Sequence, residues 1–219
     1  MNTINLELFP LEKIAQELYD FKKIGALSIP HFLTSEFCEG TVAEIKEREK
    51  YFRAAPRVEG TTLQELHTYY YGDADGLRDS GQFPLVSHLK DEYSVLYKRL
   101  GERARFQQGS VINSRGIHHY PIGSVGMGVH RDYSTDINLI SIFVLGGTAP
   151  FYVCADKQGR GKVALHSAPG SLILMRAPRN ELENDYRPYH CVGAVEEERF
   201  TLLFRQKKQT YGFTSLKIQ

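Results

Sequence analysis

Hydrophobic residues recur at helical spacing in the N-terminal half of the chain. Over 11–18 they occupy the i, i+3, i+4 and i+7 positions of an amphipathic helix, with charged residues between them. A short strand is expected at 26–29. Thr34 can cap a second helix that runs to about Lys50, and leucine and tyrosine side chains along one side predict a third helix over 86–99.

A polar, tyrosine-rich segment at 56–84 separates the second predicted helix from the third. It has no strong periodicity, and a segment of this length without one is usually functional or mobile. Tyr69 and Tyr70 lie within it. One interpretation is a substrate-binding lid, and the other is a loop whose tyrosines pack onto the core.

Short strands bounded by Gly, Pro and Asp dominate the chain after residue 105. The expected strands are 109–119, 137–145, 149–154, 162–166, 171–176, 189–195 and 199–206. Many short strands at nearly even spacing favour a sandwich or barrel over a parallel sheet with crossover helices. We therefore expect an α+β fold in which N-terminal helices pack on a double-sheet β core. The whole chain, 1–219, is expected to form one domain, with a helical and insert region, a β core and a C-terminal tail at 1–105, 106–208 and 209–219.

The composition is that of an ordinary globular protein. Its 27 Lys and Arg against 26 Asp and Glu give a net charge of +1, which removes the usual electrostatic argument for a nucleic-acid or anionic-membrane partner. Three well-separated cysteines do not form a disulfide framework. The sequence has no apolar run of membrane length and no basic, apolar leader, so we expect a cytoplasmic protein with reduced thiols.

His130 and Asp132 form the first candidate site. An imidazole and a carboxylate two residues apart can both reach a divalent metal ion, but with 8 histidines and 26 acidic residues chance alone gives roughly one such pair. His190, in a strand-like stretch later in the chain, strengthens the case. Two histidines and one carboxylate make the facial triad of non-heme Fe(II) oxygenases.

Two arginines share one face of the last predicted strand. Because side chains alternate along a strand, Arg199, Thr201 and Arg205 point one way while the phenylalanines between them point the other way. An inward-facing guanidinium needs a counter-charge, and a ligand carboxylate would provide one with a bidentate fit. The alternatives are that this face is exposed to solvent, or that internal glutamates pair with Arg199.

The sequence resembles the Fe(II)/2-oxoglutarate-dependent dioxygenase superfamily in the order of these residues. His-x-Asp comes first, a distant His follows, and then comes Arg with a hydroxyl residue two positions later. The resemblance covers roughly 105–208 and implies a double-stranded β-helix (jelly-roll) core. It also implies that His130, Asp132 and His190 bind Fe(II) and that O2 is the oxidant.

The resemblance also implies where the cosubstrate 2-oxoglutarate binds. Its distal carboxylate would bind Arg199 and accept a hydrogen bond from Thr201. The last strand is similar to that of AlkB-type dealkylases, which implies that Arg205 also serves 2-oxoglutarate and that Tyr120 contacts it. His118 shares strand parity with Tyr120, so it is either a further cosubstrate contact or a core histidine. Thr201 departs from the AlkB pattern, in which an amide is common at this position.

Substrate contacts are expected from the insert and from residues around the ligands. The candidates are Tyr69, Tyr70, Arg115, Arg131 and Tyr133. The leading hypothesis is an enzyme that hydroxylates a small molecule, an amino acid or a biosynthetic intermediate, while it converts 2-oxoglutarate to succinate. No obligatory protein partner and no membrane partner are expected. The alternatives are an AlkB-type demethylase or hydroxylase of nucleic acid or protein, and a non-catalytic, cupin-like metal-binding protein.

Overall fold

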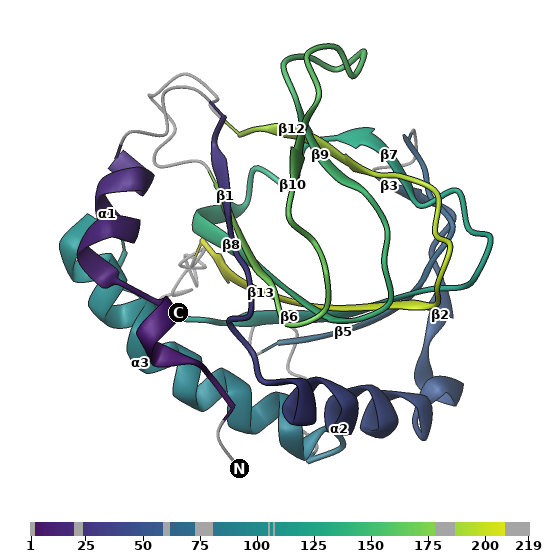
Figure 1. Cartoon of the computed structure of the whole chain (residues 1–219), viewed down its shortest axis with the longest axis horizontal. Coiled ribbons are helices and arrows are strands. Elements are labelled where there is room, and N and C mark those ends of the chain that lie inside the picture. The colour runs from purple at the N-terminus through teal and green to yellow at the C-terminus, as the bar shows by residue number, and fades with distance from the viewer. Residues whose placement is uncertain are drawn as a thin grey trace, which may run out of the picture.

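Two main β-sheets and a layer of helices make up most of the described part of the protein (Figure 1). The computed structural model describes residues 3–19, 24–58, 62–72, 81–104, 106, 108–177 and 187–208. The smaller sheet faces the larger one, and the helices cover the outer face of the larger sheet. The predicted α+β fold with a jelly-roll core is therefore confirmed.

The larger sheet has seven strands, and each neighbouring pair runs antiparallel. Its order is β1 (Ala26–Ile29), β11 (Leu172–Arg176), β8 (Asp136–Gly146), β13 (Arg199–Lys207), β6 (Ser114–Tyr120), β5 (His67–Gly72) and β2 (Arg53–Ala54). The smaller sheet has four strands in the order β10 (Val163–Leu165), β9 (Phe151–Cys154), β12 (Tyr189–Val192) and β7 (Met127–His130). A separate pair joins β3 (Arg57–Val58) to β4 (Thr62–Leu63).

The described part of the chain contains three α-helices and two short 3-10 helices, and the α-helices contribute to the hydrophobic layer on the outer face of the larger sheet. The helices are η1 (Leu6–Leu8), α1 (Leu11–Tyr19), α2 (Ser35–Lys46), η2 (Glu49–Tyr51) and α3 (Pro84–Ala104). The Thr34 side chain caps α2 as predicted, because its Oγ1 accepts a hydrogen bond from the Phe37 amide at 3.3 Å. None of the described helices is both long and apolar enough to cross a membrane.

The side chains of β13 alternate between two hydrophobic layers. Phe200, Leu202 and Phe204 lie in the layer beneath the helices, where they join side chains such as Tyr93 of α3. Leu203 instead joins the layer between the two sheets. Both faces of this strand are therefore buried, and the alternative of a solvent-exposed arginine face is wrong.

Several element boundaries differ from the predicted ones. The strand predicted from residue 109 begins at Ser114, because Gln108 and Gly109 adopt positive φ angles of 55° and 75° and turn the chain before it. The second helix ends at Lys46 and is followed by η2 instead of continuing to Lys50.

Five strands in the described part of the chain had no counterpart in the prediction: the two-residue strands β2, β3 and β4, and the longer strands β5 and β7. β5 lies inside the tyrosine-rich segment and pairs along its length with β6. β7 is a short strand that contains a glycine, and it pairs with β12. Both strands carry residues of the candidate site.

Candidate active site

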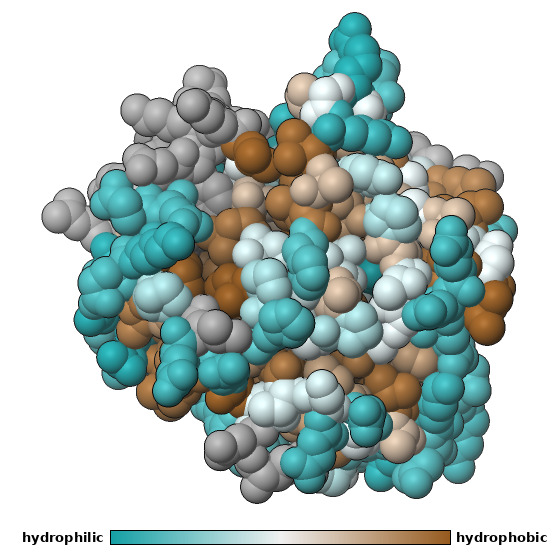
Figure 2. Space-filling model, in the orientation of Figure 1, coloured by the Kyte–Doolittle hydropathy of each residue, from teal (hydrophilic) through white to brown (hydrophobic). Residues whose placement is uncertain are grey.

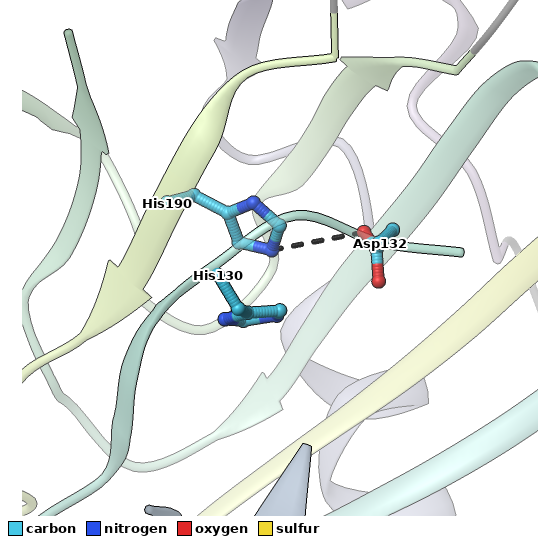
Figure 3. A group of neighbouring side chains, drawn as sticks. All are labelled: His130, Asp132 and His190. Carbon is cyan, nitrogen blue, oxygen red and sulfur yellow. Dashed lines mark ion pairs between the residues drawn. The ribbon is translucent and has the colours of Figure 1, made fainter. Parts of the chain in front are cut away.

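His130, Asp132 and His190 converge although they are far apart in the sequence (Figure 3). His130 ends β7 and lies directly opposite His190 on the neighbouring strand β12, while Asp132 follows β7 by two residues. One ligand atom from each residue lies within 4.8 Å of the others, and the His190 Nε2 atom is 3.6 Å from Asp132 Oδ2. This spacing allows the three side chains to share one metal ion.

Backbone carbonyls fix the orientation of both imidazoles. The Nδ1–H of His130 donates to the Gly128 carbonyl at 2.9 Å, and the Nδ1–H of His190 donates to the Pro188 carbonyl at 3.2 Å. In the neutral form of either ring the proton therefore lies on Nδ1, and Nε2 is left to bind a metal ion.

The charge states of the cluster also suit a divalent cation. Burial, together with the nearby His130, lowers the pKa of His190 to about 4, so this imidazole is neutral near pH 7. Burial alone would raise the pKa of Asp132, but Arg205 and the two histidines outweigh it and hold this pKa below its usual value. Two imidazoles and one ionised carboxylate are the donor set of a facial-triad Fe(II) site.

A cavity of about 150 Å³ opens beside the cluster, between the two sheets. The predicted site residues that line it are His118, Tyr120, His130, Asp132, His190, Arg199, Thr201, Arg205, Tyr70 and Tyr133. The apolar part of the lining includes Ile142, Phe151, Val192 and Leu203. The cavity thus joins the candidate metal ligands to both arginines of β13.

Arg199 is buried without an acidic partner. It is 1% exposed, and its Nη1 donates to the carbonyls of Ala149 and Ser167 at 3.1 and 3.3 Å. Its Nε has no hydrogen-bond partner, and no carboxylate among the described residues pairs with it. Burial lowers its pKa. Because an unpaired buried charge is costly, this guanidinium is suited to a ligand carboxylate.

Tyr120 lies opposite Arg199 in the register between β6 and β13. Burial raises the pKa of its hydroxyl far above neutral, so the hydroxyl stays protonated and can donate a hydrogen bond. Thr201 adds a second hydroxyl to the same cavity.

Arg205 differs from Arg199 in having two acidic partners. Its Nη2 is 3.3 Å from Asp132 Oδ1, and its Nε is 3.5 Å from Asp136 Oδ2. Asp136 is fully buried and was not among the predicted site residues. A single polar residue before an apolar strand is typical of a turn, so the sequence carried no signal for its role.

His118 and Tyr70 form a hydrogen-bonded pair in the cavity wall, with the Tyr70 hydroxyl 2.5 Å from His118 Nε2. Burial, with a smaller contribution from Arg205, lowers the pKa of His118 to about 3, so this histidine is neutral. The Tyr70 ring lies on Gly116, where a Cβ atom would be only 2.5 Å from Tyr70 Cε1. Tyr133, which is 49% exposed, also lines the cavity.

Three of the predicted substrate contacts do not line the cavity. Tyr69 neighbours Tyr70 on β5, so it faces the helical layer, and its hydroxyl donates to Gln82 Oε1 at 2.9 Å. Arg115 lies opposite Phe204 and shares that face of the sheet. Arg131 stacks on the Tyr189 ring at 4.0 Å. Strand alternation explains why Tyr69 and Arg115 face away from the cavity, and the contact of all three residues with a substrate stays a prediction.

The fold has many solved counterparts. A prolyl-4-hydroxylase from Pseudomonas putida matches with a TM-score of 0.65 and 15% identity over 90% of this chain and 99% of its own. A prolyl hydroxylase from Trichoplax adhaerens, in complex with a peptide fragment of the hypoxia inducible factor oxygen degradation domain, matches with a TM-score of 0.65 and 13% identity over 93% of both chains. JOX2, in complex with 2OG, Fe and JA, matches with a TM-score of 0.64 and 14% identity over 93% of this chain and 73% of its own.

The chain has the fold of the Fe(II)- and 2-oxoglutarate-dependent oxygenases. The jelly-roll fold that the resemblance implied is thereby confirmed, while the likeness to the AlkB-type branch stays a prediction. No protein-family model matches the sequence, and the search of curated proteins finds no match. The likeness to the oxygenases therefore lies in the backbone fold and in the order of the two histidines and the aspartate along the chain.

Proposed function

We propose that this protein is an Fe(II)- and 2-oxoglutarate-dependent dioxygenase. In this proposal His130, Asp132 and His190 bind the metal ion, and Arg199 binds the distal carboxylate of 2-oxoglutarate. The proposal depends on one observation: a facial-triad donor set and a buried arginine with no acidic partner among the described residues line the same cavity. A cupin-like metal-binding protein would have no need for the arginine.

Bound iron would supply oxygen activation coupled to the decarboxylation of 2-oxoglutarate to succinate, and the chain would supply position and a dry cavity. The Gly128 and Pro188 carbonyls keep both Nε2 atoms directed at the ion. The carbonyls of Ala149 and Ser167 hold one edge of Arg199 and leave the other edge for a carboxylate. The protonated Tyr120 hydroxyl is a donor to the same ligand.

The proposed substrate is a small molecule such as an amino acid or a biosynthetic intermediate. The size of the cavity supports this choice, as does the net charge of +1, which gives no general attraction for nucleic acid. Tyr70 and Tyr133, both partly exposed, would contact the substrate. A peptidyl substrate is the second candidate, and the likeness to a prolyl hydroxylase in complex with a peptide fragment favours it.

The proposal is tested by incubating the purified protein with Fe(II), 2-oxoglutarate, air and a cell extract as the source of substrate. We expect succinate to form, and a mass gain of one oxygen atom in either the small-molecule or the peptide fraction identifies the substrate class. Asp132→Ala should abolish succinate production, because the metal site loses its only carboxylate. Asp91→Asn removes an exposed acid of α3 and is the matched control, which should keep full activity.

The absence of succinate with the wild-type protein would contradict the proposed reaction. Succinate production by Asp132→Ala would instead remove Asp132 from the ligand set.

A further inference from the structure

Asp136 is a buried acid next to the candidate metal site. It is 0% exposed, and neither of its carboxylate oxygens has a hydrogen-bond partner. Its ion pair is with Arg205, whose Nε lies 3.5 Å from Oδ2. A buried carboxylate without hydrogen bonds is costly, so the pairing with Arg205 must offset that cost.

A bulge in β8 brings Asp136 to this position. Arg205 lies opposite Ile140, but the next residue, Gln206, lies opposite Ile137, so β8 contains extra residues at this point. Asn138 adopts a left-handed φ of 64° in the bulge, and its side chain donates to Gln206 Oε1 at 2.8 Å. The bulge therefore shifts Asp136 along the strand toward Arg205.

Arg205 lies between Asp136 and the metal ligand Asp132. Its Nη2 is 3.3 Å from Asp132 Oδ1, whereas the other oxygen, Oδ2, faces His190 Nε2 at 3.6 Å. A guanidinium prefers to bind a carboxylate through two parallel hydrogen bonds. If Arg205 bound Asp132 in that way, both carboxylate oxygens of Asp132 would turn away from the imidazoles.

We propose that Asp136 is a positioning residue of the metal centre. Asp136 binds the Nε side of the Arg205 guanidinium, so that only one guanidinium nitrogen reaches Asp132. The Oδ2 atom of Asp132 then stays free for the metal ion. Asp136 also gives Arg205 a second counter-charge, so that the metal ligand Asp132 does not have to balance the guanidinium alone. This inference rests on the proposed metal binding by His130, Asp132 and His190.

The test measures the affinity of the purified, metal-stripped protein for Mn(II) by calorimetry, since Mn(II) is stable in air. Asp136→Asn keeps the shape of the side chain but removes its charge, and we expect Mn(II) to bind at least about tenfold more weakly. Asp136→Glu should restore part of the affinity. Asp91→Asn, which removes an exposed acid, should bind Mn(II) as the wild type does.

The double variant Asp136→Asn, Arg205→Met separates positioning from folding. It removes both buried charges and frees Asp132 from the guanidinium, so its Mn(II) affinity should exceed that of Asp136→Asn alone. A folded Asp136→Asn variant with wild-type affinity would overturn the inference. A double variant as weak as the single one would overturn it too, because Arg205 would then not be the intermediary.

A failure of the proposed function would look different. In that case His130→Ala would bind Mn(II) as tightly as the wild-type protein, or the wild-type protein would not bind it at all.

Discussion

At the scale of single residues, the two arginines of β13 differ in what surrounds them. Among the described residues, Arg199 donates hydrogen bonds to backbone carbonyls and pairs with no carboxylate, so its charge is available to a ligand. Arg205 lies between two carboxylates, one of which belongs to the candidate metal site. The sequence predicted that both would serve 2-oxoglutarate. The sequence could not show that the two arginines differ, because Asp136, which pairs with Arg205, comes from another strand.

A pH dependence of stability follows from His118. Burial lowers the pKa of this histidine to about 3, whereas in the unfolded chain its ordinary pKa is 6.5. The unfolded state therefore binds a proton that the folded state does not bind. The metal-free protein should lose stability as the pH falls below about 6.5, by up to about 1.4 kcal/mol per pH unit from this residue.

Urea unfolding at several pH values between about 6.5 and 4.5 checks this prediction. His118→Gln can still bond to Tyr70 but does not titrate, so its free energy of unfolding should fall less steeply with decreasing pH. Equal slopes for the variant and the wild type would show that His118 is not held neutral by the fold.

At the scale of secondary-structure elements, alternation along β13 was predictable because apolar and polar residues alternate in its sequence. The prediction that Arg199, Thr201 and Arg205 share a face agrees with their common position on the cavity. β5 could not be predicted in the same way. Its tyrosines have no alternating polarity, although Tyr69 packs beneath the helices and Tyr70 lines the cavity.

The β7–β12 pair shows why the site depends on long-range pairing. β7 is short and contains a glycine, so its sequence carries little strand signal. Its pairing with β12 nevertheless sets His130 directly opposite His190. The order of the two histidines and the aspartate along the chain was visible in the sequence. The strand register that brings them together was not.

The contact between Tyr70 and Gly116 predicts an energetic coupling between β5 and β6. Gly116→Ala would place a Cβ atom 2.5 Å from the Tyr70 ring, and overpacking of this kind should cost roughly 1–3 kcal/mol of stability. In a Tyr70→Ala background the clash is absent and the cost should be smaller. A double-mutant cycle by urea unfolding measures the difference, and an equal cost in both backgrounds would contradict the contact.

At the scale of the whole molecule, the two hydrophobic layers have different roles. The helices and the larger sheet enclose an aromatic core that includes Phe32, Tyr93 and Phe143. The space between the sheets holds the polar site residues and a smaller apolar cluster. Figure 2 shows hydrophobic residues at the surface among polar ones on the face that is viewed in Figure 1.

The order of helices and then short strands was enough to predict this α+β architecture. Of the residues that line the cavity, Tyr70 and Tyr133 were predicted, whereas Gln64 and Thr68, from the segment without periodicity, were not. The division of the chain into one domain and its cytoplasmic location stay predictions.

The most direct test of the account is an anaerobic titration of the Fe(II)-loaded protein with 2-oxoglutarate. Binding is followed by the visible charge-transfer absorption that arises when a 2-oxo acid chelates Fe(II). We predict that the absorption saturates at an equimolar ratio with the wild-type protein. Arg199→Lys should need about 30- to 100-fold more 2-oxoglutarate, because it loses a charge-assisted bidentate pair worth roughly 2–3 kcal/mol. Unchanged 2-oxoglutarate affinity in Arg199→Lys, or no absorption from wild-type protein that holds iron, would contradict the account.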